Sequence, residues 1–404
     1  MKLAEAGWQR SGELRHLIEV LGGEAGESRF VGGCVRDTLL GLPVSDIDIA
    51  TRLLPPDVLD RLGSAGIKAV PTGLAHGTVT AVLAGKPVEI TTLRRDVSTD
   101  GRHATVAYTD DWREDAARRD FTMNALSADP VSLEMFDYFG GEEDIRARRV
   151  RFIGDPLQRI AEDHLRILRY FRFHARFGDG EPDGPALQAC TARANDLMAL
   201  SRERIAGELI KLLTLPNPTE TLRLMQDKGI LAPVLPEIDP ESVARLGRLV
   251  ARETLLGLQP DPVRRLAALL PQDVQAARDI GARLKLSNGW RARLEEYAVP
   301  GDRVPRVRHL AYCVGVKRAL DLLLLDDIPD EALQSDYAEL QGWEPPSFPL
   351  KGGDLIAMGL PKGPIVAKTL HELTTAWCEA GFPAAEKVRE LARSHVDQAL
   401  RDRQ

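Results

Sequence analysis

The sequence predicts an α+β fold in which strands occupy the first third of the 404-residue chain and helices occupy the rest. Up to about Phe139, short runs of apolar and β-branched residues alternate with helical patterns and are separated by turn residues. From Asp155 onward the strand signals stop, and helical patterns continue between short Pro and Gly breaks. The clearest of these breaks, residues 344–349, predicts a linker before a last helical segment.

The elements of the first third can be placed in order along the chain. An amphipathic helix is expected first, because Leu14, Leu17 and Leu21 recur at helical spacing. Four strands are expected next, at residues 29–31, 47–50, 78–83 and 87–92, with a turn at residues 84–86.

The overall charge gives no sign of a nucleic-acid partner, because the formal net charge is -7 and no global basic field exists. The local charge differs. Residues 145–176 contain nine arginines against three acidic side chains. This segment is therefore expected to bind a polyanion.

The four cysteines lie far apart and form no Cys-x-x-Cys pair, which argues against a zinc site and a disulfide framework. They are expected to be reduced thiols. The first residues carry no signal-peptide pattern, and no run reaches the roughly 20 apolar residues of a membrane span. We therefore expect a cytoplasmic protein with no membrane partner.

A phosphate-binding turn is predicted where the first strand ends in Gly32 and Gly33 and runs into a helix. Bare backbone N–H groups and the helix dipole favour an anion at such a junction. The ordinary alternative is a simple turn, since two adjacent glycines alone usually form one.

A metal site is predicted close by, at Asp46 and Asp48. Strand alternation places these two carboxylates on the face opposite the neighbouring isoleucines. Glu89 alternates in the same way on a later strand and is expected as a third catalytic carboxylate. Hard oxygen ligands of this kind select Mg²⁺ for phosphoryl chemistry. The alternatives are solvated aspartates in a loop and an exposed glutamate on an edge strand.

Residues 118–125 combine arginines, a carboxylate and an amide within two turns. Arginine forks suit phosphate, while Asp120 and Asn124 suit ribose hydroxyls or an orienting hydrogen bond. Taken alone, the same pattern is also typical of a salt-bridged helix.

A helix is expected over residues 157–173, after an Asp cap and a Pro at its first turn. Its apolar side chains gather on one face, and a row of arginines gathers on the other. On the polar face, Asp163 and Arg166 offer an acceptor and donors to the edge of a base. A solvated charged face is the alternative.

These segments, in this order, resemble the class II tRNA nucleotidyltransferase and bacterial poly(A) polymerase family of the polymerase beta superfamily. The resemblance covers the first 210 residues or so, with five or six ordered motifs. The matching motifs are Gly32-Gly33-x-Val35-Arg36-Asp37, Asp46-x-Asp48, Asp100-Gly101-Arg102, Arg118-Arg119-Asp120-Phe121-Thr122-x-Asn124-Ala125, Glu162-Asp163-x-x-Arg166 and Ser201-Arg202-Glu203-Arg204-Ile205.

The resemblance implies a small mixed-sheet nucleotidyltransferase head followed by an all-helical neck, body and tail. The expected boundaries are 1–140 for the head, 141–215 for the neck, 216–345 for the body and 346–404 for the tRNA-binding tail.

The resemblance also implies roles for particular residues. Asp46 and Asp48 would coordinate magnesium, and Asp163 with Arg166 would act as a protein template for the incoming base. His164 departs from the proline that relatives often have there, and we expect it to pack on the apolar side. The nucleotide-binding residues implied are Gly32, Gly33, Arg36, Arg119, Asp120, Asn124, Asp163, Arg166, Arg169 and Arg172.

Among the activities of the family, the sequence favours addition of C, C and A to the 3′ end of tRNA from CTP and ATP. Residues 70–79 lack the basic patch typical of poly(A) polymerases, and residues 94–113 keep a loop that enzymes adding only CC tend to lack. The alternatives are an A-adding enzyme or poly(A) polymerase of the same fold and, from another class, a non-catalytic tRNA-binding factor.

Overall fold

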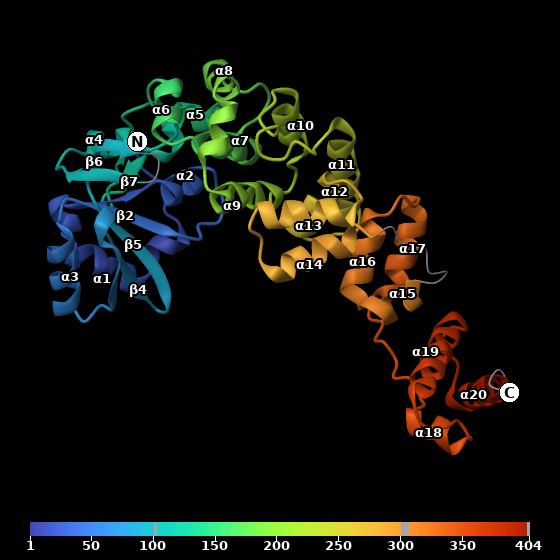
Figure 1. Ribbon diagram of the computed structural model, residues 1–404. Coiled ribbons are helices and arrows are strands. Elements are labelled where there is room, and N and C mark those ends of the chain that lie inside the picture. The colour runs from blue at the N-terminus through green and yellow to red at the C-terminus, as the bar shows by residue number, and fades with distance from the viewer. Residues whose placement is uncertain (101–102, 300–306, 402–404) are drawn as a thin grey trace. The chain divides into compact units, whose positions relative to one another are not determined.

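The computed structural model describes residues 1–100, 103–299 and 307–401, which form two compact units, Met1–Pro240 and Glu241–Gln404. Every described strand lies in the first unit, and the regular structure described in the second unit is helical (Figure 1). The predicted α+β class is therefore confirmed, with a mixed sheet followed by many helices.

The first unit is built on a seven-stranded sheet with the strand order β3-β4-β5-β2-β1-β8-β9. Strands β2 and β5 are parallel, and the other neighbouring pairs are antiparallel. The four predicted strands are present, with ends that shift by no more than one residue. The strands are β1 (Ser28–Val31), β2 (Ile47–Thr51), β3 (Ala69–Gly73), β4 (Thr78–Leu83), β5 (Lys86–Thr92), β8 (Ser127–Ala128) and β9 (Met135–Phe136).

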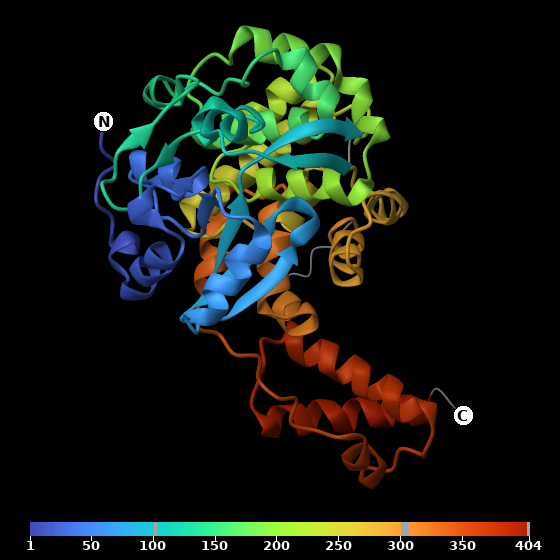
Figure 2. The same cartoon turned by 90° about the vertical axis from the view of Figure 1, so that its left-hand side faces the viewer.

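Helices pack against this sheet (Figure 1, Figure 2). Helix α2 packs against β1 and β2, and α3 packs against β3 and β4. Leu17, Val35, Ile49 and Leu62 are fully buried among them. The helices of this unit are α1 (Gly12–Val20), α2 (Gly33–Leu39), α3 (Pro55–Ser64), α4 (Trp112–Ala117), α5 (Gly141–Arg146), α6 (Pro156–Glu162), α7 (Arg166–Phe177), α8 (Gly184–Ala192), α9 (Arg202–Leu213) and α10 (Thr219–Asp227), with short 3-10 turns at Gly7–Arg10, Gly23–Ala25, Leu74–His76, Thr122–Asn124 and Ala194–Ala199.

The expectation of a loop over residues 94–113 is wrong for most of that segment, which forms a separate antiparallel hairpin. Register partners run from Arg94 with Tyr108 to Asp100 with His103, so the two backbone segments pair with each other over most of their length. Gly101 and Arg102 of the predicted Asp-Gly-Arg motif lie outside the described residues. The strands of the hairpin are β6 (Arg94–Asp100) and β7 (His103–Tyr108).

The predicted continuous helix over residues 157–173 is also wrong, because it is broken into α6 and α7. Asp163 ends α6 with φ -153° and ψ 105°, an extended backbone. Its carboxylate accepts the backbone N–H of Leu165 at 3.1 Å. His164 lies in this break and not on a helix face. An extended backbone is what a proline requires of the residue before it, so either residue fits at position 164.

The second unit contains a further series of helices and ends in a small core of its own. Leu355, Leu373 and Val388 are buried in this core, beyond the predicted linker at residues 344–349, which has no helix. The helices are α11 (Pro240–Leu255), α12 (Pro262–Leu269), α13 (Val274–Arg283), α14 (Asn288–Tyr297), α15 (Val307–Val314), α16 (Val316–Leu325), α17 (Asp330–Leu340), α18 (Gly352–Ala357), α19 (Pro364–Glu379) and α20 (Ala385–Arg401).

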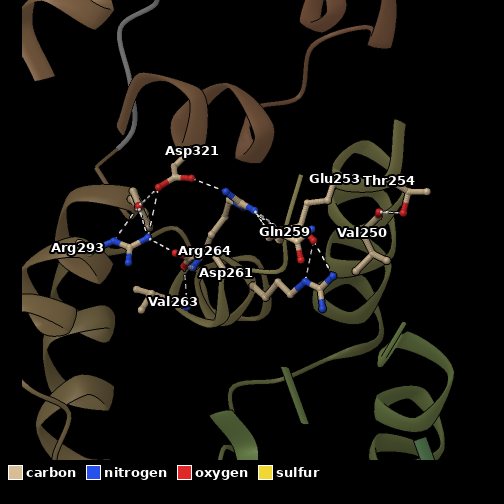
Figure 3. A network of polar contacts seen from close by, with 11 residues as sticks. Val250, Glu253, Thr254, Gln259, Asp261, Val263, Arg264, Arg293 and Asp321 are labelled. Atoms are coloured by element: carbon tan, nitrogen blue, oxygen red, sulfur yellow. Dashed lines mark hydrogen bonds and ion pairs between the residues drawn. The ribbon is translucent and has the colours of Figure 1, made fainter. Parts of the chain in front are cut away.

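A buried network of charged side chains joins four of these helices (Figure 3). Arg264 of α12 donates to Glu253 of α11 at 2.6 Å and to Asp321 of α16 at 2.5 Å. The hydroxyl of Tyr297 on α14 donates to the other oxygen of Asp321 at 2.5 Å. Breaking a buried ion pair leaves a charge uncompensated at a cost of about 3–5 kcal/mol, so the network fixes how these helices pack.

Two further observations concern the whole described chain. No described helix combines the length and apolar character that a membrane crossing requires. All four cysteines are free, as the sequence predicts, and only Cys313 among them is exposed.

Candidate active site

A pocket of about 590 Å³ in the first unit gathers most of the predicted site residues. Its lining includes seven arginines and three aspartates, an excess of positive charge that suits a polyphosphate. The predicted residues that line it are Gly32, Gly33, Arg36, Asp48, Arg119, Asp120, Asn124, Asp163, Arg166 and Arg169.

Of the three carboxylates predicted for the metal site, Asp48 lines the pocket, whereas Asp46 and Glu89 do not. Strand alternation holds as predicted, since Val88 and Ile90 are buried and Glu89 between them is exposed. Asp48 and Glu89 are register partners on β2 and β5. Burial, the charge of Glu89 and the charge of Asp46 raise the pKa of Asp48, against the opposing effect of Arg119. The site therefore concentrates negative charge that a cation would neutralise.

Gly32 is needed at the junction of β1 and α2 for two reasons. Its φ of 70° is in the left-handed region. A Cβ built there would lie 2.9 Å from Nη1 of Arg119 and about 4.0 Å from a carboxylate oxygen of Asp48. Glycine at this position therefore lets the arginine approach the carboxylate.

A chain of hydrogen bonds crosses the pocket from α2 to α7. Arg36 donates from Nη1 to Oδ1 of Asn124 at 2.5 Å, and Asn124 donates from Nδ2 to Asp120 at 2.9 Å. The other oxygen of Asp120 accepts from Nε of Arg169 at 2.9 Å. Burial alone would raise the pKa of Asp120, but Arg169 and Asn124 outweigh it and lower that pKa. These hydrogen bonds therefore hold the four polar side chains in fixed positions relative to one another.

Asp115, which the sequence reasoning missed, orients the two arginines that follow helix α4. It is buried and accepts from Arg118 at 2.8 Å and from Arg119 at 3.4 Å. Burial would raise the pKa of Asp115, but these two arginines lower it. Asp115 follows Glu114 shortly before the two arginines, and this acidic pair was the available sequence signal for a residue that binds them. Acidic residues at this place are equally typical of the first turn of a helix.

The predicted base-reading pair lies at the break between α6 and α7. Asp163 accepts from Arg204 of α9 at 2.7 Å, and Arg166 donates to Glu162 at 2.6 Å. The side chain of Arg166 is only 12% exposed. The predicted polar face is therefore an ion-paired wall of the pocket and not a solvated surface.

Arg172 is placed differently from the prediction. It donates from Nε to Glu208 of α9 at 2.6 Å and does not line the pocket.

The lining also contains residues that the sequence reasoning did not select as site residues, although Arg118 and Arg204 stand in the motifs on which the resemblance rests. These residues are Arg94, Arg118, Leu165, Phe173 and Arg204.

Comparison with known proteins identifies the family. The family pattern described as Poly A polymerase head domain matches residues 28–151, and the pattern described as probable RNA and SrmB- binding site of polymerase A matches residues 183–242. The mitochondrial CCA tRNA nucleotidyltransferase 1 of Mus musculus is 36% identical over 385 residues, which span 91% of this chain and 87% of the relative. The chain belongs to the CCA tRNA nucleotidyltransferase family.

Two further members of this family extend the comparison. The Homo sapiens mitochondrial enzyme of the same name is 35% identical over 91% of this chain and 87% of its own length. The crystal structure of the Bacillus stearothermophilus CCA-adding enzyme in complex with CTP has 28% identity and a TM-score of 0.74. That comparison covers 96% of this chain and 100% of the other, so the similarity extends beyond the pocket to both units.

CCA tRNA nucleotidyltransferases are metal-dependent, and the residues around Asp48 fit a cation. The described residues contain no group of three or more His, Cys, Asp and Glu side chains arranged to hold a metal ion. Mg²⁺, however, is commonly bound by one or two carboxylates, with substrate phosphates and waters as the other ligands. Asp48 lines the pocket, and the charge of Asp46 contributes to its raised pKa, so two carboxylates lie near each other there.

Proposed function

We propose that this protein adds C, C and A to the 3′ end of tRNA from CTP and ATP, releasing pyrophosphate at each step. The observation that carries the proposal is the shared pocket, where a carboxylate, a set of arginines and the Asp163–Arg166 pair line one cavity. Relatives that align with about nine tenths of the chain are named for this activity.

In the proposed reaction, the 3′ hydroxyl oxygen of tRNA attacks the α-phosphorus of the nucleotide, and the bond to the pyrophosphate oxygen breaks. Asp46 and Asp48 would hold Mg²⁺, which lowers the pKa of an attacking hydroxyl and neutralises a departing pyrophosphate. Glu89 would act through its charge on Asp48. Mutual repulsion among these carboxylates favours uptake of a cation.

The arginines would bind and orient the triphosphate. Arg119 is anchored by Asp115, so its guanidinium is held in position before the nucleotide arrives. Arg36, Asn124 and Asp120 would contact the phosphates and sugar from their hydrogen-bonded chain. Groups held in place in advance lose less entropy when the substrate binds.

Selection of the base would come from Asp163 and Arg166. Cytosine and adenine both present an exocyclic amine beside a ring nitrogen, so one acceptor and one donor can pair with either base. Guanine and uracil present the inverse pattern and would leave buried polar groups unpaired. Asp163 would exchange its ion pair with Arg204 for this contact, while Arg169 and Arg172 support α7 through Asp120 and Glu208.

We further propose the division of the chain into a head (1–140), a neck (141–215), a body (216–345) and a tRNA-binding tail (346–404). The head family pattern and the helical character of the rest support this order.

The location proposed here is the cytoplasm. The free cysteines are consistent with a reducing compartment of this kind.

The test uses purified protein, Mg²⁺, a tRNA that ends at the discriminator base, and each labelled nucleotide in turn. Incorporation of CTP followed by ATP, with a product ending in CCA, is the expected result. A product extended only from tRNA already ending in CC would identify an A-adding enzyme, and a long A tract would identify a poly(A) polymerase. Binding of tRNA without incorporation would identify a non-catalytic factor.

A further inference from the structure

We propose that Arg159 is a positioning residue that holds the base-reading Arg166 in register with the backbone of the phosphate-binding Arg118–Arg119 segment. This inference rests on the proposed function and adds a residue to it. Arg159 does not line the pocket, so it would act through its neighbours and not through the nucleotide.

The geometry of Arg159 ties α6 to the segment that follows α4. Its Nη2 donates to the carbonyl oxygen of Arg118 at 2.6 Å and to that of Arg119 at 2.5 Å. Its Nη1 donates to Oε2 of Glu162 at 2.5 Å. The residue is only 8% exposed. One guanidinium therefore fixes two backbone carbonyls and one carboxylate at the same time.

The same carboxylate holds Arg166. Oε2 of Glu162 accepts from Nη1 of Arg166 at 2.6 Å, and Nη1 of Arg166 also donates to the backbone carbonyl of Arg159 at 2.8 Å. The direct link from Arg166 to the Arg118 carbonyl is long, at 3.5 Å. The firm connection between Arg166 and the arginine segment thus runs through Arg159 and Glu162.

This arrangement explains why arginine is required and not merely a positive charge. A guanidinium offers donors in a rigid planar fork, whereas a lysine ammonium is a point charge on a flexible stem. Lysine at position 159 would preserve the charge next to Glu162 without holding both carbonyls. The break between α6 and α7 would then shift relative to Arg118 and Arg119, and a misplacement of about 1 Å can reduce rate by about a hundredfold.

The experiment compares the full-length wild type with Arg159→Lys, Arg159→Gln and the control Arg193→Gln. Arg193 lies outside the pocket and pairs with Asp196 at 2.5 Å, so its loss removes an arginine ion pair from a neighbouring helix end. For each protein, kcat and KM are measured separately for CTP and UTP on tRNA lacking CCA. The melting temperature and the Kd for tRNA are measured alongside.

Arg159→Lys is expected to lower kcat/KM for CTP by about tenfold or more while that for UTP changes by less than about twofold. Its preference for CTP therefore falls, with melting temperature and tRNA affinity close to those of the wild type. Arg159→Gln should show the same loss or a larger one, and Arg193→Gln should keep the wild-type preference.

Two results would overturn the inference. One is wild-type preference in Arg159→Lys, which would mean that charge alone is needed. The other is an equal loss for CTP and UTP, which would mean that Arg159 only stabilises the fold. If the wild type itself adds no nucleotide to tRNA, the proposed function fails, and this outcome is distinct because it does not depend on any variant.

Discussion

Asp48 and Glu89 stand opposite each other in the register of the parallel strands β2 and β5. Burial raises the pKa of Asp48 first, and the charge of Glu89 raises it further. Carboxylates held this close repel one another, and Arg119 offsets this repulsion only in part, so they carry a cost in the stability of the folded protein. Because Asp48 carries this cost and Asp46 is exposed, substitutions of these two carboxylates should differ in their effect on stability.

Asp48→Asn and Asp46→Ala are both expected to abolish nucleotide addition while leaving the Kd for tRNA within a few-fold, because the carboxylates act on the transition state. Their stabilities should differ. At neutral pH with EDTA, Asp48→Asn should raise the melting temperature by roughly 2 °C, since it removes a partly buried charge. Asp46 is exposed, so its loss should leave the melting temperature unchanged. Wild-type turnover by either variant would remove that carboxylate from the mechanism.

Gly32→Ala is expected to destabilise the protein by about 1–2 kcal/mol and to raise the KM for nucleotides. The new Cβ would require a left-handed backbone and would lie 2.9 Å from Nη1 of Arg119. Gly33→Ala is the matched comparison. Its nearest neighbour would be Nη2 of Arg36 at an ordinary 3.7 Å, so its effect should be clearly smaller. Urea unfolding and steady-state kinetics check both, and equal effects would contradict the steric argument.

Arg166→Ala should relax the choice between C or A and the other two bases more than it weakens triphosphate binding. In the proposed reaction, base contacts and phosphate contacts would come from different side chains in the pocket. The measurement is kcat/KM for all four nucleotides, with competition by pyrophosphate reporting the phosphate site. A uniform drop for all four would make Arg166 a phosphate contact.

Shortening the β6–β7 hairpin should leave addition of CC largely intact but stop the reaction before the terminal A. A pocket that prefers cytosine twice and then adenine must change shape, and this hairpin forms a sheet separate from the seven-stranded one. Gel analysis of products on tRNA lacking CCA tests this. Complete CCA at the normal rate would exclude the hairpin as the switch, and loss of C addition would make it part of the common site.

Asp120→Asn should lower stability at neutral pH and lose that effect in acid. The pKa of Asp120 is lowered in the folded state, since Arg169 and Asn124 outweigh burial. Its contribution is therefore full above the ordinary carboxyl pKa of about 3.9 and is lost as the pH falls through the lower folded value. Urea unfolding of wild type and variant at several pH values measures the difference. A gap that stays constant into acid would show that the charge of Asp120 is not responsible.

Local patterns in the sequence were enough to predict the strands that carry the carboxylates. Val88 and Ile90 are buried while Glu89 is exposed, because alternation is a property of the extended backbone itself. Strands β8 and β9, with two residues each, were missed because they are too short to alternate. Strand β3 was missed because it contains Pro71 and Gly73, and both residue types are uncommon inside strands.

The ordered motifs determined which family the chain belongs to and which residues are candidates for the site. What only the tertiary structure decided is how those residues are held. The pairing of Asp163 with Arg204 joins residues 41 apart in the chain, and no periodicity encodes it. Counting side chains around one continuous helix placed Arg159 and Arg166 together on one polar face, with a solvated face as the alternative, whereas the structure pairs both of them with Glu162 beside the break at Asp163. Periodicity describes one element at a time, while the position of a charged side chain depends on the distant groups that compensate its burial.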